Sequence, residues 1–197
     1  MVSEVVLELY MLKCSVITRD LARVMGELSL RDERSEIERH TDGLVEGHLN
    51  QIDYQILSDA RKMGEFYRIF YALENDIRQL IGETMDVAYP QGWWTSYTPQ
   101  AVRENVEKNK QREEAEGIPP RSNRNIDYTT FGELGEVIKE NWNVFSGIFS
   151  NASKGRVLRV INRLNLARGP IAHCGILPVE ETVRLKLTVR DWYSLME

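Results

Sequence analysis

Residues 56–81 carry apolar side chains that are mostly three or four positions apart, the spacing that places them on one face of an α-helix. The apolar positions are Ile56, Met63, Phe66, Tyr67, Phe70, Leu73, Ile77, Leu80 and Ile81. A face of this width is stable only where other elements cover it. We therefore expect a long helix that forms the spine of a helical core.

The first part of the chain is predicted to form a separate helical extension. Apolar side chains at helical spacing indicate a helix over residues 3–28. The charged stretch 29–51 has few apolar anchors and contains two glycines, so we expect a broken helix or a connector there. The chain is thus divided into an N-terminal helical extension, residues 1–55, and a helical domain, residues 56–197.

An aromatic loop is predicted after the long helix, and we expect Trp93 and Trp94 to anchor this loop to the core rather than to stack on bases. Thr98 followed by Pro99 then resembles an N-cap with proline at the first helical position. The helix that follows, to about Glu116, has almost no apolar face. We expect it to be an exposed excursion from the core.

The next helix is marked by a capping box. Thr130 and Glu133 have the Thr-x-x-Glu spacing in which two side chains satisfy the free N–H groups at a helix start. Apolar anchors continue at helical spacing to Phe149. We therefore expect one helix through this whole stretch.

The C-terminal part is predicted to hold two more helices. The first runs from about Ser153 to Arg168 and is interrupted by Gly169 and Pro170. The last segment fits a helix or a strand, and its opening proline and two early glutamates favour the helix. Its apolar stripe would be Val179, Val183 and Leu187. The predicted fold class is all-α throughout.

Composition narrows the class of protein. Two cysteines among 197 residues are too few for a disulfide framework and point to a reducing compartment. The N-terminus has no basic stretch before its apolar run, so we expect no signal peptide, and no uncharged run is apolar enough to cross a membrane. A cytoplasmic protein is expected. The net charge of −5 argues against a general nucleic-acid coat but leaves room for a local basic patch.

Such a patch is present between residues 151 and 179, where there are five cations and no Asp or Glu. Three of the cations, Arg156, Arg159 and Arg163, share one face of the predicted helix. One interpretation is a solvated face, because cations are favourable near a helix C-terminus. The other is a row of arginines that binds RNA phosphates.

Arg168 and His173 follow within the stretch RGPIAHC. If the chain turns at Gly169 and Pro170, both side chains can face one pocket. An imidazole exchanges protons near neutral pH, and a guanidinium can stabilise a pentavalent phosphate. This pair suffices for RNA cleavage by the neighbouring 2′-hydroxyl without a metal or cofactor. The alternative is a packed or capping histidine, and the spacing of His40, Glu46 and His48 matches no metal pattern.

RGPIAHC resembles the R-x4-6-H motif of the HEPN superfamily, all-α domains that are mostly metal-independent ribonucleases. Four further stretches resemble the branch typified by the C-terminal domain of a nuclear mRNA-surveillance endonuclease: YALENDIRQLI, GWW, FGELGEVIKENWNVF and RLKLTVRDW. The resemblance covers roughly residues 64–196, in order, and several motifs together are more specific than Arg-x4-His alone.

The resemblance implies that Arg168 and His173 are the catalytic pair and that Glu74 and Arg78 lie near them. A structural alternative is that Glu74 and Arg78 only stabilise their own helix as an i, i+4 pair. The resemblance also implies a homodimer in which the two motifs meet across the two-fold axis. Gly169 departs from the family, which commonly has Asn or another polar residue after the arginine.

The expected function is therefore a metal-independent endoribonuclease, a toxin or defence effector. Its expected partners are RNA, a second copy of the chain, and a cognate antitoxin or regulatory protein. Two alternatives stay open. One is a catalytically inactive HEPN module that dimerises or binds RNA or nucleotides for a partner, and the other is a regulatory scaffold joined to the N-terminal extension.

Overall fold

The computed structural model describes residues 36–149 and 151–197. These ranges hold eight α-helices, one 3-10 helix and no strand, so the predicted all-α class is confirmed. The chain divides into two compact units between Asp53 and Tyr54. The helix predicted over residues 3–28 lies outside the described residues. No described helix is long and apolar enough to cross a bilayer.

The described part of the first unit, residues 36–53, contains one helix, α2, Glu36–Leu49. It is continuous where a broken helix or a connector was predicted. Gly43 and Gly47 both lie inside it. Each interior glycine costs about 1 kcal/mol relative to alanine, which lowers helix propensity without ending a helix. The glycines were therefore given too much weight in the prediction.

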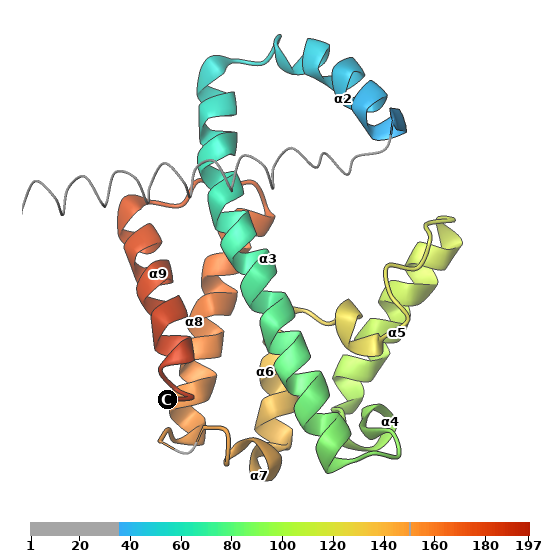
Figure 1. Cartoon of the computed structure of the whole chain (residues 1–197), viewed down its shortest axis with the longest axis vertical. Helices are drawn as coiled ribbons and strands as arrows, with labels where there is room; N and C mark the ends of the chain where they lie inside the picture. Colours follow the sequence, from blue (N-terminus) through green and yellow to red (C-terminus); the bar gives the residue numbers. More distant parts are fainter. Residues whose placement is uncertain (1–35, 150) are drawn as a thin grey trace, which may run out of the picture. The chain divides into compact units, whose positions relative to one another are not determined.

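Helix α3, Tyr54–Ala88, runs through the second unit, with α8 and α9 on one side of it and α5 and η1 on the other (Figure 1). The predicted long helix is confirmed. Its buried apolar face is formed by Phe70, Leu73, Ile77, Ile81 and Met85. Ile56 and Tyr67, which were predicted to belong to that face, are exposed.

The predicted aromatic loop contains a short helix, α4, Trp93–Tyr97. Trp93 anchors it, because the ring is buried in the core and its Nε1 donates a hydrogen bond to Asp86 at 2.8 Å. Thr98 is not an N-cap: it is extended and buried, and its hydroxyl makes no hydrogen bond with another described residue.

Helix α5, Gln100–Ala115, begins after Pro99, whose carbonyl accepts from the N–H groups of Val102 and Arg103. The helix is less exposed than predicted, because Val102 and Val106 are buried. The 3-10 helix η1, Asn125–Tyr128, packs against it. Two valines one turn apart are a narrow apolar face, but they suffice to attach α5 to the core.

The capping box of Thr130 and Glu133 is confirmed at the start of α6, Phe131–Glu140. The Glu133 carboxylate accepts from the Thr130 N–H at 2.6 Å and from its hydroxyl at 2.8 Å. The predicted single helix is wrong, since the chain breaks at Asn141 before α7, Trp142–Phe145. The Asn141 amide donates to the carbonyls of Tyr97 and Val137, both at 2.9 Å, which ties the break to α4.

Helix α8, Lys154–Ala172, starts after Ser153 as predicted, and Ser153 caps it. Gly169 and Pro170 do not end it, as they were expected to do. Gly169 has no Cβ to clash with the following proline ring, which removes most of the usual barrier to a helical residue before proline. Pro170 leaves only the Leu166 carbonyl without a donor, and Leu166 is exposed, so water can replace that bond.

The last segment is a helix, α9, Val179–Tyr193, as predicted, but it uses a different face. Its buried residues are Leu185, Thr188 and Trp192. The predicted inward stripe of Val179, Val183 and Leu187 is exposed. The core of the second unit therefore lies between α3, α6, α8 and α9, and one apolar side of α9 is left outside it.

Candidate functional site

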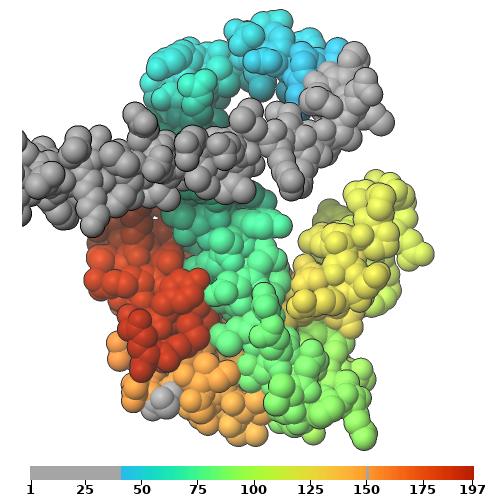
Figure 2. Space-filling model, in the orientation of Figure 1, coloured from blue at the N-terminus to red at the C-terminus, as the bar shows by residue number. Residues whose placement is uncertain are grey.

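The second unit has a cleft of about 660 Å³ between α3, the segment 121–127 and the last turn of α8. Figure 2 shows the surface hollowed between α3 and the yellow segment next to η1. Four arginines and two carboxylates line the cleft, which gives it a net charge of +2 in a chain whose net charge is −5. The cleft therefore favours an anionic ligand.

Glu74 on α3 lies at the centre of the charged side chains in this cleft. One of its carboxylate oxygens pairs with Arg78, and the other lies 3.4 Å from Nε of Arg168 on α8. The side chains of Glu74 and Arg78 are only 12% and 14% exposed. One largely buried carboxylate thus holds two arginines from two helices.

Arg78 connects α3 to a third element. Its Nη2 donates to the backbone carbonyl of Thr129 at 2.7 Å, and its Nη1 donates to Asn75 at 3.2 Å. The interpretation that Glu74 and Arg78 serve only their own helix is therefore wrong. They join α3 to α8 and to the residue that precedes the α6 capping box.

Arg168 lines the cleft, and its side chain is 37% exposed. Glu74 approaches its Nε, and the guanidinium donates no hydrogen bond to any residue in the described part of the chain. A guanidinium fixed on one side and otherwise unpaired can donate to phosphate oxygens.

His173 is exposed and does not line this cleft. It is the C-cap of α8, and its N–H donates to the Gly169 carbonyl at 3.1 Å. Because the helix continues past Gly169 and Pro170, five residues place His173 about 140° around the helix axis from Arg168. Within one chain, the structure does not bring the two predicted catalytic side chains into one pocket.

The backbone after His173 has a defined geometry. Cys174 is left-handed, with φ 57°, and the Gly175 N–H donates to the Pro170 carbonyl at 2.7 Å. This hydrogen bond, from an N–H to the carbonyl five residues earlier, is typical of a Schellman cap. Cys174 occupies the left-handed position where glycine is usually found. The cap fixes where the backbone of His173 lies at the end of α8.

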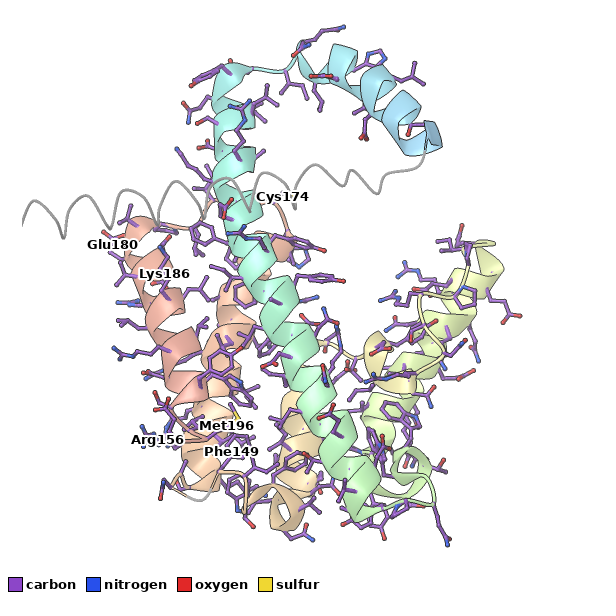
Figure 3. All side chains as sticks on the ribbon, viewed as in Figure 1. Phe149, Arg156, Cys174, Glu180, Lys186 and Met196 are labelled. Atoms are coloured by element: carbon purple, nitrogen blue, oxygen red, sulfur yellow. The ribbon has the colours of Figure 1, made fainter. Side chains whose placement is uncertain are left out.

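The basic row, Arg156, Arg159 and Arg163, is exposed and forms no ion pair within the described residues. It does not line the cleft. Figure 3 shows Arg156 and Cys174 at opposite ends of α8, and twelve residues of helix separate Arg156 from Arg168 by about 18 Å. At about 100° per residue, the row also lies on the other side of the helix from Arg168.

The cleft residues that were not predicted as site residues include Tyr67, Tyr71, Arg121 and Arg124. The tyrosines share the spacing of Glu74 and Arg78, so one stripe of α3 carries all four side chains. In the sequence of α3, this stripe of tyrosines and charged residues beside the apolar stripe was the signal that could have indicated the site. The two arginines lie in a loop, and only tertiary structure shows that they face α3.

Two further points of the sequence analysis concern the tryptophan pair and metal binding. Trp93 and Trp94 anchor α4, as predicted, with their rings 5.4 Å apart and Trp93 buried. In residues 36–149 and 151–197, no group of three His, Cys, Asp or Glu side chains could hold a metal ion.

Residues 68–197 match the family model described as Swt1-like HEPN. This range contains every residue of the cleft except Tyr67, together with Arg168 and His173. No curated protein and no solved structure matches the chain.

Proposed function

Because the chain belongs to the Swt1-like HEPN family, we propose that it is an endoribonuclease that cleaves RNA without a metal ion. The observation that carries this proposal is the state of Arg168. Its Nε faces a largely buried carboxylate, the rest of the guanidinium has no partner among residues 36–149 and 151–197, and the side chain lines a cleft with a positive charge. This arrangement suits a group that binds a phosphate whose charge increases during the reaction.

In the proposed reaction, Arg168 donates hydrogen bonds to the scissile phosphate. His173 acts as general base or acid. As base it takes the proton of the 2′-hydroxyl, whose oxygen attacks the neighbouring phosphorus. The bond from phosphorus to the 5′-oxygen then breaks, and His173, as acid, gives a proton to that oxygen. The products are a 2′,3′-cyclic phosphate and a 5′-hydroxyl. Glu74 and Arg78 are positioning residues that hold Arg168.

We place His173 in this reaction by proposing a homodimer in which each site combines Arg168 of one protomer with His173 of the other. Two observations support it. His173 is exposed outside the cleft of its own chain. The apolar stripe Val179, Val183 and Leu187 begins six residues after it and is also exposed. A second copy related by a two-fold axis would bury the same stripe on both protomers.

The basic row is proposed to attract RNA to the dimer without contacting the scissile phosphate. The row and the cleft are on opposite sides of α8, so their effects on RNA binding are separable. We also propose that the chain is a toxin or defence effector restrained by a cognate antitoxin or regulatory protein.

One observation favours a second candidate function, a catalytically inactive module that binds RNA or a nucleotide. Gly169 stands where the family commonly has a polar side chain. A Cβ added there would meet nothing within 4 Å, so the space for such a side chain is present and unused. If a hydrogen bond from that position is needed for catalysis, this chain retains binding alone.

The test is cleavage of mixed cellular RNA by the purified full chain in the presence of EDTA. Wild type is expected to cleave, while Arg168→Ala and His173→Ala are each expected to lose most activity. His48→Ala, which changes an exposed histidine on α2, is the matched control and should behave as wild type. Loss of activity in EDTA that magnesium restores would refute the proposal, and a folded wild type that binds RNA without cleaving it would favour the inactive module.

A further inference from the structure

Two tyrosines form one wall of the cleft. Tyr67 and Tyr71 lie one turn apart on α3, are 61% and 63% exposed, and have ring centroids 6.3 Å apart. Neither hydroxyl makes a hydrogen bond within the described part of the chain. Two large rings that are exposed next to each other and line a cationic cleft are available to a ligand with flat, apolar faces.

The opposite wall is cationic and is held in place. The Nε of Arg121 donates to Glu113 at 2.7 Å, and its guanidinium lies 5.0 Å from the centre of the Tyr128 ring. Both contacts fix the side chain, which is still 55% exposed. Nη2 of Arg121 also pairs with Glu113, so the charge that Arg121 presents to the cleft is partly balanced. The fixed side chain loses less entropy on binding than a free arginine would.

Arg124 lies further along the same wall. Its Nε is 3.7 Å from an Asp127 carboxylate oxygen. Its Nη2 lies close to Gly82, because a Cβ added to that glycine would be only 3.3 Å from the Nη2 atom. The absence of a side chain at Gly82 thus lets the Arg124 guanidinium rest against α3. The cleft is therefore lined by the Tyr67 and Tyr71 rings of α3, by the guanidinium groups of Arg121 and Arg124 from the segment before η1, and by Arg168 of α8.

We infer that this cleft is a binding subsite for single-stranded RNA, in which unpaired bases stack on Tyr67 and Tyr71 while Arg121 and Arg124 bind the phosphates that follow. The inference rests on the proposed ribonuclease function and specifies its substrate. In a duplex the base faces are already stacked on each other, so two exposed rings offer it nothing. An unpaired strand has both free base faces and flexible phosphates.

The size of the cleft supports a strand over a duplex. About 660 Å³ is the volume of a site for a small organic ligand, and it is bounded on two sides by protein. A short stretch of unpaired nucleotides can enter a site of this size. The strand would reach Arg168 from the tyrosines, so the tyrosines would select unpaired RNA before any cleavage.

The test measures binding by fluorescence anisotropy with RNA that cannot be cleaved because each 2′-hydroxyl is methylated. The ligands are a single strand, the duplex of the same sequence, and AMP. The variants are Tyr67→Ala, Tyr71→Ala and Tyr71→Phe. The control is Tyr54→Ala, which removes a tyrosine that is 77% exposed on the same helix but outside the cleft. Circular dichroism checks that each variant is folded.

Each alanine variant in the cleft is expected to weaken single-strand binding by about 5- to 150-fold, the range for losing one base–aromatic stack. Tyr71→Phe keeps a ring and should bind like wild type, as should Tyr54→Ala. Arg124→Gln should lower the salt dependence of binding by about one phosphate contact. Duplex binding should be weaker than single-strand binding and should not respond to the tyrosine variants.

Three results would overturn the inference: equal affinity for duplex and single strand, unchanged binding in both alanine variants, or AMP affinity equal to that of the strand. Its failure is distinguishable from failure of the proposed function. If the methylated strand requires the tyrosines and the unmethylated strand is never cleaved, the subsite stands and the ribonuclease proposal is refuted. If RNA is cleaved without dependence on the tyrosines, the ribonuclease proposal stands and the subsite is refuted.

Discussion

Replacing Glu74 with glutamine tests whether one carboxylate organises the cleft. The side chain is 12% exposed and holds Arg78, itself largely buried. Glutamine keeps the shape but turns a charged hydrogen bond of about 1.5–3 kcal/mol into a neutral one of about 0.5–1.5 kcal/mol. The weaker, part-exposed pair with Arg168 adds about 0.5 kcal/mol. We expect the free energy of unfolding to fall by about 2 kcal/mol, or the melting temperature by roughly 4–8 °C.

Urea and thermal unfolding followed by circular dichroism measure this change. The matched control is Glu65→Gln on the same helix, because Glu65 pairs with Arg68 at 2.9 Å but both side chains are largely exposed. That substitution should cost less than about 0.5 kcal/mol. Arg168→Ala should also lower the free energy of unfolding by less than about 1 kcal/mol, since Arg78 remains to balance the charge of Glu74. Equal losses for Glu74→Gln and Glu65→Gln would refute the argument, and a large loss for Arg168→Ala would make that arginine structural.

Three further predictions follow from the geometry. Val183→Glu should give a folded monomer in light scattering that no longer cleaves RNA. The control Val87→Glu, at an exposed valine on α3, should leave the dimer intact. A monomeric wild type would contradict the composite site. Mixing and refolding Arg168→Ala with His173→Ala should restore part of the activity, because one site of each mixed dimer is complete, and no recovery would mean that each chain uses its own pair. Cys174→Gly should raise the free energy of unfolding by about 0.5–1 kcal/mol by relieving the left-handed backbone, while Cys174→Val should lower it, and the opposite order would show that the cap is not strained.

The spine helix and the confirmed cap were predictable because both depend on residues close in the chain. Leu73, Ile77 and Ile81 repeat at helical spacing, and burial follows once any neighbour covers them. Thr130 and Glu133 satisfy each other within one turn. Local patterns of this kind need no knowledge of the tertiary structure.

Two of the errors arose where distant residues decide the local structure. The break at Asn141 depends on a carbonyl of Tyr97, 44 residues away, which no local pattern contains. The face of α9 that is buried depends on which helices are present to cover it, and the stripe through Val183 has no cover within the described chain. Helical spacing showed that a stripe exists and could not show what lies against it.

Only part of the candidate site was predictable from the sequence, because the rest depends on contacts between distant residues. Arg168 was selected by the chemistry of its side chain and by resemblance, and Glu74 by resemblance alone. The structure places Arg168 Nε 3.4 Å from a Glu74 carboxylate oxygen, across two helices. Tyr67 was assigned to the core because tyrosine counts as apolar in a periodicity analysis. Arg121 is placed by Glu113 and Tyr128 from outside its own loop, so its position in the cleft required the structure.

The most direct measurement of the central claim is the 3′ end of the RNA fragments that the wild-type chain produces in EDTA, determined by mass spectrometry. If the RNA 2′-hydroxyl attacks the phosphate that Arg168 binds, the fragments end in a 2′,3′-cyclic phosphate and begin with a 5′-hydroxyl. A substrate with a 2′-methoxy group at the cleaved position should then be resistant. Fragments with a 3′-hydroxyl and a 5′-phosphate, or equal cleavage of the 2′-methoxy substrate, would contradict the mechanism.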